Sequence, residues 1–144
     1  MRPRIFFDTN IMLDLIQERP GYQYAARLLQ RQEDGDITVC ISILSMANIA
    51  YVLRKTIPQN LIVPTLKQIS SVVEVIPMDN DQLQLALLME GPDFEDIMQA
   101  ACAASYGCQV ILTHNPGDFK IKKGLLDTVS LPNVMTPEQY SHLI

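Results

Sequence analysis

The sequence predicts an α/β fold in which a mostly parallel central sheet is flanked by helices. Short β-type runs alternate with longer helical patterns along the chain, and no internal repeat, low-complexity tract or linker interrupts the alternation. The chain has 144 residues, of which 48% are hydrophobic and 19% charged, and this composition supplies enough apolar side chains for one core. We therefore expect a single domain over residues 1–144.

Changes of hydrophobic period predict the elements at the start of the chain. Arg4–Phe7 is a compact apolar run that is typical of a buried strand, and Ile11–Leu15 returns to helical spacing. Residues 22–33 place apolar side chains on one helical face before Gly35, which is a good helix stop. Thr38–Ile41 then predicts the second strand.

The middle of the chain is predicted to continue the alternation. Either Ser42 or Ser45 can begin a helix that runs to about Lys55, because a serine side chain caps the first free N–H groups of a helix. Residues 60–70 predict a further helix. Val72–Ile76 is rich in β-branched residues and predicts the third strand.

The last third of the chain is predicted to hold one central strand between helices. Its Ala-rich segment begins with acidic residues, which the helix dipole favours in a first turn. The expected elements, in chain order, are a helix at Asp79–Glu90, a helix at Asp93–Tyr106, a strand at Val110–Thr113, a short strand around Val129 and Val134, and a helical segment at Pro137–Ile144.

Composition excludes several classes of protein. No apolar run approaches the roughly 20 residues that a membrane-spanning helix needs, and the chain begins without a signal-peptide pattern, so we expect a cytoplasmic protein with no membrane partner. Cys40, Cys102 and Cys108 lack CxxC spacing and are expected to be core thiols rather than a disulfide framework or a zinc site.

The charge of the chain is acidic overall, with two small basic clusters. Eleven Lys and Arg against 16 Asp and Glu give a formal net charge of −5, which denies the chain the basic field of a non-specific nucleic-acid binder. An RNA partner would therefore have to be bound locally by the basic clusters. The alternative is that the side chains of these clusters are simply solvated. The candidates for RNA contact are Arg54, Lys55, Lys120, Lys122 and Lys123.

Polar side chains follow two of the predicted strands and open one of the predicted helices. Asp8 and Asn10 follow the first strand, and Thr113, Asn115 and Asp118 follow the fourth. Ligands of open parallel sheets bind beyond the carboxyl ends of the strands, so both groups are expected at one edge. The acidic first turn at Asp93, Glu95 and Asp96 is expected to join them, with Asp93 and Asp96 on neighbouring positions of one helical face.

Such a carboxylate pocket predicts a divalent cation. Clustered carboxylates repel one another unless a cation compensates them, and an all-oxygen donor set suits Mg²⁺ or Mn²⁺. A metal of this kind polarises a phosphoryl oxygen and generates or orients a hydroxide for in-line attack on a phosphodiester. Neither His114 nor His142 lies in a zinc-ligand pattern.

Each part of this pocket also has a purely structural explanation. Asp8 or Asn10 can cap the helix that follows, Asp93 can cap its own helix, and the run from Asn115 to Asp118 is an ordinary turn sequence. Asp14 and Glu18 are most simply part of the solvated face of a helix. Asp8 is the hardest to explain in this way, because a carboxylate directly after a buried strand is costly without a partner.

Three segments of the chain, within roughly residues 4–120, carry a family resemblance: FFDTNIMLDLI, ISILSMANIAYVLRK and DFEDIMQAACAASYGCQVILTHNPGDF. They resemble PIN-domain proteins, the fold of the VapC-type toxins and related metal-dependent ribonucleases. The resemblance implies a three-layer PIN-like fold. It also implies that Asp8 and Asp96 bind the metal, that Asn115 or Asp118 completes the cluster, and that Asp93 assists.

The chain departs from this family pattern at two positions. The family usually places a Glu on the middle helix, where this chain has Asn48, and many relatives have Asp where it has Asn115. An amide can still bind a metal through its oxygen, but it brings no charge and cannot act as a base. Asp8, Asp96 and Asp118 would leave three carboxylates for one Mg²⁺ or Mn²⁺ ion, with Asn10 and Thr113 as further supporting residues.

The resemblance implies a metal-dependent endoribonuclease, as the toxin of a toxin–antitoxin pair, with an antitoxin partner, an RNA substrate and homodimerisation. One alternative is a catalytically impaired PIN-like module that binds RNA or protein, which Asn48 and the net acidity favour. A minor alternative is a phosphoacceptor α/β domain with Asp8 as the acceptor. Nucleotide-binding enzymes are less consistent with the sequence, because it contains neither GxxxxGK[ST] nor GxGxxG.

Overall fold

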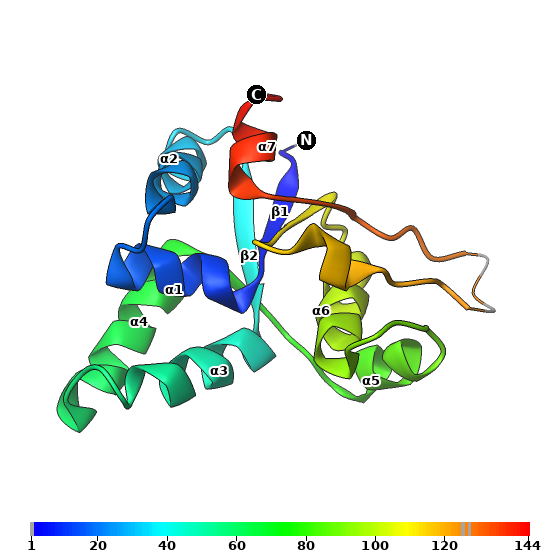
Figure 1. Ribbon diagram of the computed structural model, residues 1–144, viewed down its shortest axis with the longest axis horizontal. Helices are drawn as coiled ribbons and strands as arrows, with labels where there is room; N and C mark the ends of the chain where they lie inside the picture. Colours follow the sequence, from blue (N-terminus) through cyan, green and yellow to red (C-terminus); the bar gives the residue numbers. More distant parts are fainter. Residues whose placement is uncertain (1, 125, 127) are drawn as a thin grey trace.

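A computed structural model describes residues 2–124, 126 and 128–144 of the chain. The strands form one sheet in the order β3-β2-β1-β4-β5, and every pair of neighbours is parallel (Figure 1). Their bounds are Arg4–Phe7 (β1), Thr38–Ser42 (β2), Glu74–Ile76 (β3), Val110–Leu112 (β4) and Asn133–Met135 (β5). Because β1 is central and both of its neighbours run parallel to it, Asp8 leaves the middle of the sheet at its carboxyl edge.

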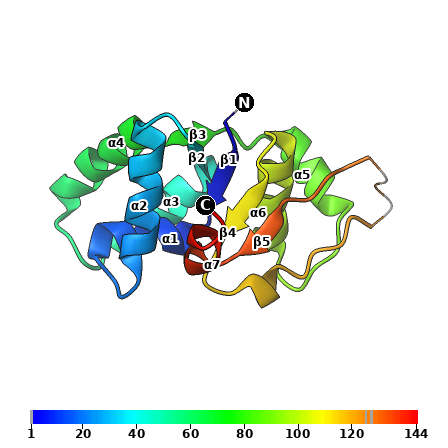
Figure 2. The same ribbon diagram turned by 90° about the horizontal axis from the view of Figure 1, so that it is seen from above.

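Helices cover both faces of this sheet. Figures 1 and 2 show α1 to α4 on one side and α5 and α6 on the other. The helical bounds are Thr9–Gln17 (α1), Tyr22–Glu33 (α2), Ile43–Leu53 (α3), Ile62–Val72 (α4), Asn80–Leu87 (α5), Phe94–Ser105 (α6) and Pro137–Ser141 (α7), with short 3-10 helices at Gln59–Leu61 (η1) and Pro116–Phe119 (η2).

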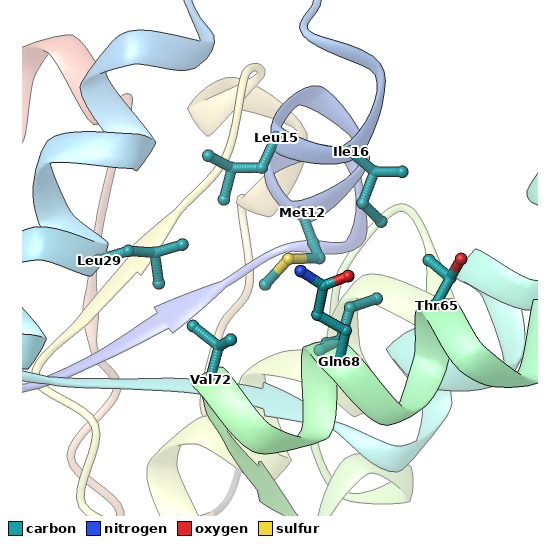
Figure 3. A pocket seen from close by; sticks show the side chains of 8 residues that line it. Met12, Leu15, Ile16, Leu29, Thr65, Gln68 and Val72 are labelled. Carbon is teal, nitrogen blue, oxygen red and sulfur yellow. The ribbon is translucent and has the colours of Figure 1, made fainter.

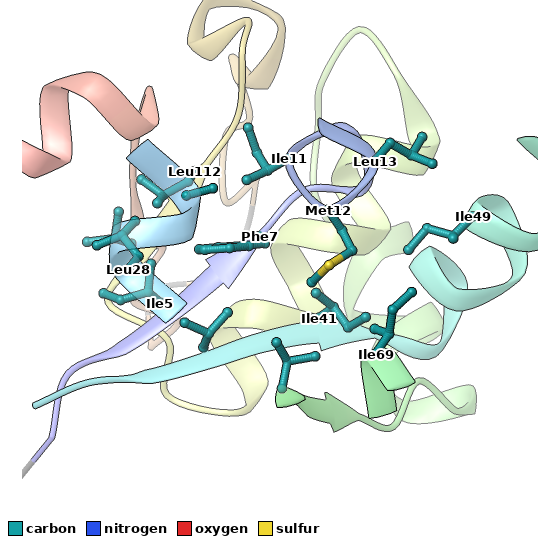
Figure 4. Close-up of a cluster of buried hydrophobic side chains, with 14 of the residues drawn as sticks. Ile5, Phe7, Ile11, Met12, Leu13, Leu28, Ile41, Ile49, Ile69 and Leu112 are labelled. Carbon is teal, nitrogen blue, oxygen red and sulfur yellow. The ribbon is translucent and has the colours of Figure 1, made fainter. Parts of the chain in front are cut away.

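Alternation along the strands separates two apolar cores. Ile5 and Phe7 of β1 point into the core beneath α1 to α4, and Phe6 points into the core beneath α5 and α6. Figure 4 shows the first core, where Phe7 and Ile69 lie among side chains from the sheet and the surrounding helices. The predicted three-layer α/β arrangement is therefore confirmed, and the sheet is parallel throughout its described strands.

Local signals explain most element boundaries. Ser42, not Ser45, caps α3, because its hydroxyl accepts the Ser45 N–H at 3.0 Å. The helix predicted over residues 22–33 is present with the same bounds. Cys40, Cys102 and Cys108 are buried free thiols, as their spacing predicts.

Several predicted boundaries differ from those of the structure. Val72 ends α4 rather than beginning β3, since the helical N–H bond from Val73 to the carbonyl of Ile69 persists there. The helix predicted to reach Glu90 stops at Leu87, and Glu90 forms an antiparallel bridge with Lys122 instead. In the last strand the ladder with β4 includes Val134 but not Val129.

Among the described residues, no helix is both long enough and apolar enough to cross a bilayer.

Candidate active site

Asp8 lies at the carboxyl edge of the sheet, where hydrogen bonds hold both of its side-chain oxygens. Its Oδ1 accepts the backbone N–H of Thr9 at 2.9 Å, which makes it the cap of α1. Its Oδ2 accepts the Thr113 hydroxyl at 3.1 Å, from the residue that follows β4. Burial raises the pKa of Asp8 above its ordinary value, although these two hydrogen bonds oppose the shift. The capping explanation of Asp8 is therefore confirmed.

A cavity of about 250 Å³ opens in front of Asp8. Residues of α1, α3 and α6 form its walls, so three segments that are distant in the sequence meet there. The lining residues are Asp8, Thr9, Asn10, Leu13, Asn48, Tyr51, Val52, Glu95 and Asp96. Asp8, Asn10, Asn48 and Asp96 were among the site residues that the sequence suggested.

The first turn of α6 supplies most of the negative charge. Asp93 caps this helix through a 3.2 Å hydrogen bond from the Asp96 N–H, so its capping role is confirmed, and it does not line the cavity. Burial, followed by the charges of Asp93, Asp8, Glu95 and Asp118, raises the pKa of Asp96 to about 7. The carboxylates are therefore close enough to repel one another without a compensating cation.

Glu95 is the lining residue whose individual role the sequence did not reveal. The Asn48 side-chain N–H donates to Glu95 Oε1 at 2.7 Å, which joins the middle helix to the first turn of α6. Asn48 stands where the family pattern usually has Glu, so in this chain a carboxylate from the neighbouring helix lies beside that position. The signal available in the sequence was the acidic first turn of α6.

The polar residues after β4 lie at the rim of the site. Asn115 and Asp118 are exposed and do not line the cavity, so the structure does not place either of them among its walls. Asp118 lies on η2 and its charge contributes to the raised pKa of Asp96. Thr113 is buried and accepts the Asn115 N–H at 3.4 Å while it donates to Asp8.

Asp14 is buried, and the expectation that it faces solvent is wrong. Only 4% of Asp14 is exposed, and its carboxylate contacts His114 Nε2 and pairs with Arg19 at 3.8 Å. Glu18, by contrast, is exposed as expected. The Asp14–His114 contact ties α1 to the loop that follows β4 and holds the start of that loop against the site.

A buried network of neutral side chains lies beneath the carboxylates. Thr9 donates to the Ser45 hydroxyl at 3.0 Å, and the same hydroxyl accepts from Gln99 Nε2 at 2.9 Å. Ser42 donates to Gln99 Oε1 at 2.6 Å. Because these residues belong to or adjoin α1, α3 and α6, the network fixes the three helices that form the cavity walls.

The donor set of the cavity fits a hard divalent cation that keeps part of its hydration shell. Among residues 2–124, 126 and 128–144, no three His, Cys, Asp or Glu side chains are grouped tightly enough to form a complete metal cluster. Asp8 and Asp96 nevertheless line one cavity with Glu95 and the Asn48 amide beside them. Mg²⁺ is typically bound by one or two carboxylates and several waters, so this arrangement suits it, and the absence of thiol or imidazole donors in the lining disfavours zinc.

The predicted RNA-contact cations divide into two groups by position. Arg54 and Lys55 are exposed at the end of α3 and lie beside Tyr51, which lines the cavity. Lys120, Lys122 and Lys123 are exposed after η2 and do not line the cavity.

A second, apolar groove of about 370 Å³ lies on another side of α1 (Figure 3). It runs between α1, α2 and α4, and its carboxylate-free lining contrasts with that of the cavity in front of Asp8. The residues are Met12, Leu15, Ile16, Leu29, Thr65, Gln68, Ile69 and Val72.

Comparison with solved structures supports the fold. VapBC2 from Rickettsia felis, bound to a promoter DNA fragment, is 17% identical with a TM-score of 0.65, over 92% of this chain and 98% of the other. DNA-bound VapBC from Salmonella typhimurium is 18% identical with a TM-score of 0.66, over 94% and 98%. Mycobacterium tuberculosis VapC20, described as a sarcin-ricin loop cleaving toxin, is 21% identical with a TM-score of 0.61, over 80% and 92%.

Sequence comparison identifies the family. No curated protein sequence matches the chain. The model of the PIN domain matches residues 4–116, a range that includes β1, the middle helix, the acidic turn of α6 and β4. With most of its length matched and the cavity at the expected edge of the sheet, this chain belongs to the PIN-domain family.

Proposed function

We propose that this PIN-domain protein is a metal-dependent endoribonuclease that hydrolyses RNA phosphodiester bonds, and that it is the toxin of a toxin–antitoxin pair. The observation that carries the proposal is the meeting of Asp8 and Asp96 in one water-accessible cavity at the carboxyl edge of the sheet. The structural neighbours, which include VapBC complexes and a toxin that cleaves the sarcin-ricin loop, agree with it.

Mg²⁺ or Mn²⁺ would be held by Asp8 and Asp96, with Asp118 able to add a third carboxylate from the rim. When bound, the ion supplies polarisation of a phosphoryl oxygen and a nucleophilic hydroxide at neutral pH. Asp8 is preset for this role, because the Thr9 N–H and the Thr113 hydroxyl fix the orientation of its carboxylate.

Glu95 can act as a general base, which the Asn48 amide cannot do. Asn48 holds Glu95 Oε1 through its side-chain N–H, and this contact leaves Oε2 to accept a proton from a water molecule in the cavity. An amide side chain has no such basic oxygen at neutral pH. In this proposal Asn48 positions the base, and Glu95 supplies it.

An antitoxin is the proposed protein partner. The apolar groove between α1, α2 and α4 suits an apolar segment of such a partner, because burial of apolar surface drives association. We propose that the protein acts in the cytoplasm, where RNA and an antitoxin would both be present.

Homodimerisation remains a prediction. Size-exclusion chromatography coupled to light scattering measures the oligomeric state that tests it. A strict monomer at micromolar concentration would contradict it. The helix α2, one candidate interface, turns Ala25 and Leu28 into the core, so only its outer face is available to a second copy.

The test of the proposed function is cleavage of end-labelled RNA by the purified protein with Mg²⁺, with Mn²⁺ or with EDTA. Cleavage should require the metal and fall at least about 100-fold in Asp8→Asn, because the loss of one ligand charge removes several kcal/mol of transition-state stabilisation. Asp81→Asn is the matched control, since Asp81 is exposed on α5 and away from the cavity lining. Equal cleavage by Asp8→Asn and the parent protein would overturn the proposal.

A PIN-like module that binds without cutting is the second candidate, and Asn48 is the observation that favours it. A folded protein that binds RNA, fails to cut it with either metal and shows no heat of Mn²⁺ binding would establish this alternative. Calorimetric Mn²⁺ binding that Asp8→Asn abolishes would argue against it.

A further inference from the structure

An exposed aromatic ring forms part of the wall of the carboxylate cavity. Tyr51 lines this cavity together with Asp8 and Asp96, yet 56% of the residue is exposed. It lies three positions after Asn48 on α3, and this spacing puts both residues on one side of the helix. The ring is not part of either apolar core, so core packing does not account for it.

Two cations lie beside the same ring. The Arg54 guanidinium carbon is 3.9 Å from the ring centroid, and Lys55 Nζ is 5.4 Å from it. No ion pair among the described residues involves Arg54 or Lys55, so neither charge is neutralised by a carboxylate there. In a chain with a formal net charge of −5, this is a local positive surface next to the candidate catalytic carboxylates.

The chain contains a second Tyr–Arg pair with the same spacing, and the two pairs differ in position. Arg27 lies over the ring of Tyr24 at 5.7 Å on α2, where Tyr24 is only half exposed and lines neither the carboxylate cavity nor the apolar groove. A tyrosine with an arginine three positions later is therefore not by itself a site. The pair at Tyr51 is distinguished by greater exposure and by its place at the cavity.

We propose that Tyr51 is a stacking platform for an unpaired base of the RNA, with Arg54 and Lys55 binding the phosphates on either side of that base. Bases stack on exposed aromatic rings, and arginine beside the ring adds cation–π and phosphate contacts. The inference rests on the proposed function and specifies its substrate: a nucleotide next to the scissile phosphate must be unpaired, because duplex RNA buries the faces of its bases.

The experiment measures RNA binding apart from cleavage. In an Asp8→Asn background with EDTA, fluorescence anisotropy compares a single-stranded RNA with a duplex of the same sequence. Tyr51→Ala should weaken single-strand binding about tenfold and duplex binding less than about twofold, since only the unpaired base loses its stacking partner. Tyr51→Phe should retain the affinity because it keeps the ring, and Tyr24→Ala is the matched control.

A spectroscopic measurement accompanies the affinities. A 2-aminopurine base in the single strand should be quenched on binding to the parent protein and less quenched with Tyr51→Ala. Thermal unfolding followed by circular dichroism establishes that the exposed substitution leaves the fold intact. Unchanged single-strand affinity in Tyr51→Ala, or an equal loss of affinity for single strand and duplex, would contradict the proposal that an unpaired base stacks on Tyr51.

The outcomes separate this inference from the proposed function. If Asp8-dependent cleavage occurs while Tyr51→Ala binds single strands as tightly as its parent, the proposed nuclease function is supported and the stacking role of Tyr51 is wrong. If the folded protein with Asp8 intact neither binds nor cuts either RNA, both fail.

Discussion

Two polar layers lie at the same edge of the sheet and differ in how their polar atoms are satisfied. The neutral layer is buried, and its side chains hydrogen-bond to one another; it consists of Thr9, Ser42, Ser45 and Gln99. The charged layer opens to the cavity, and its members repel one another; it consists of Asp8, Glu95 and Asp96. The polar groups of the neutral layer satisfy one another, whereas the carboxylates of the charged layer repel one another.

The same helices contribute to both layers, and this shows how the site is held. Thr9 follows Asp8 directly, and Gln99 lies one turn after Asp96 on α6. A satisfied buried network is rigid and specifies one arrangement of the elements that carry it. The neutral layer therefore holds the carboxylates in place against their mutual repulsion, and the charged layer is left available for a cation.

The largest predicted effect follows from breaking the neutral layer. Gln99→Met keeps the length of the side chain and removes its amide, which leaves Ser42 and Ser45 without their partner from α6. The free energy of unfolding should fall by about 2–4 kcal/mol, because unsatisfied buried polar groups are costly. Urea unfolding measures it, with Gln68→Met as the exposed control. A loss no greater than that of the control would mean that the layer does not hold the helices.

The next effect comes from the hydrogen bond that orients Asp8. Thr113→Val removes the hydroxyl that donates to Asp8 Oδ2 and changes little else in shape. Affinity for Mn²⁺ should fall about 10- to 100-fold, as expected when a partner that orients a metal ligand is lost. Calorimetric titration measures this, and Thr113→Ser should restore the affinity. Unchanged affinity in Thr113→Val would show that Asp8 is positioned without Thr113.

A smaller effect is predicted for the position that departs from the family pattern. Asn48→Glu adds a carboxylate beside Glu95 and removes the N–H that now binds it. Affinity for Mn²⁺ should rise about 3- to 10-fold because ligand charge strengthens binding of hard cations, while the metal-free protein should lose about 0.5–1 kcal/mol of stability through repulsion. Asn48→Gln, which keeps the amide, is the control. A weaker metal affinity in Asn48→Glu would contradict this prediction and show that the Asn48–Glu95 hydrogen bond contributes more to metal binding than an added charge does.

Local patterns were sufficient to predict the sheet edge and its first acid. An apolar strand followed at once by Asp8, and an acidic turn before an Ala-rich helix, are signals within a few residues of sequence. The rule that parallel strands share a carboxyl edge predicted that Asp8 and the residues after β4 lie at one edge, and the acidic turn was expected to join them. In the structure Asp8 and Asp96 line one cavity, whereas Asn115 and Asp118 do not.

The contacts that the sequence did not reveal all join distant segments. Asn48 and Glu95 are 47 residues apart, and their pairing depends on how α3 and α6 are set against each other by the buried network. Asp14 is buried and contacts His114, which is 100 residues away in the sequence. No periodicity encodes such distances, since it reports only which face of an element is apolar.

The smallest predicted effect is the pH dependence of the charged layer itself. Burial and neighbouring carboxylates raise the pKa of Asp96 to about 7, above the value of about 3.8 for the unfolded chain. The folded state therefore holds a proton that the unfolded state has released between these pH values, so the metal-free protein loses stability as the pH rises from about 4 to about 7.

Because Asp96 is only half-buried, solvent screens the repulsion and the change should amount to less than about 1 kcal/mol. Urea unfolding in EDTA at about pH 5.5 and about pH 8 measures it, with Asp96→Asn as the variant that should lose less stability over this interval. Addition of Mn²⁺ should stabilise the parent protein most at the higher pH, where Asp96 is ionised and the repulsion among the carboxylates is greatest. An Asp96→Asn protein with the same pH dependence as its parent would show that the charged layer is not strained, and the contrast between the two layers would then lie in burial alone.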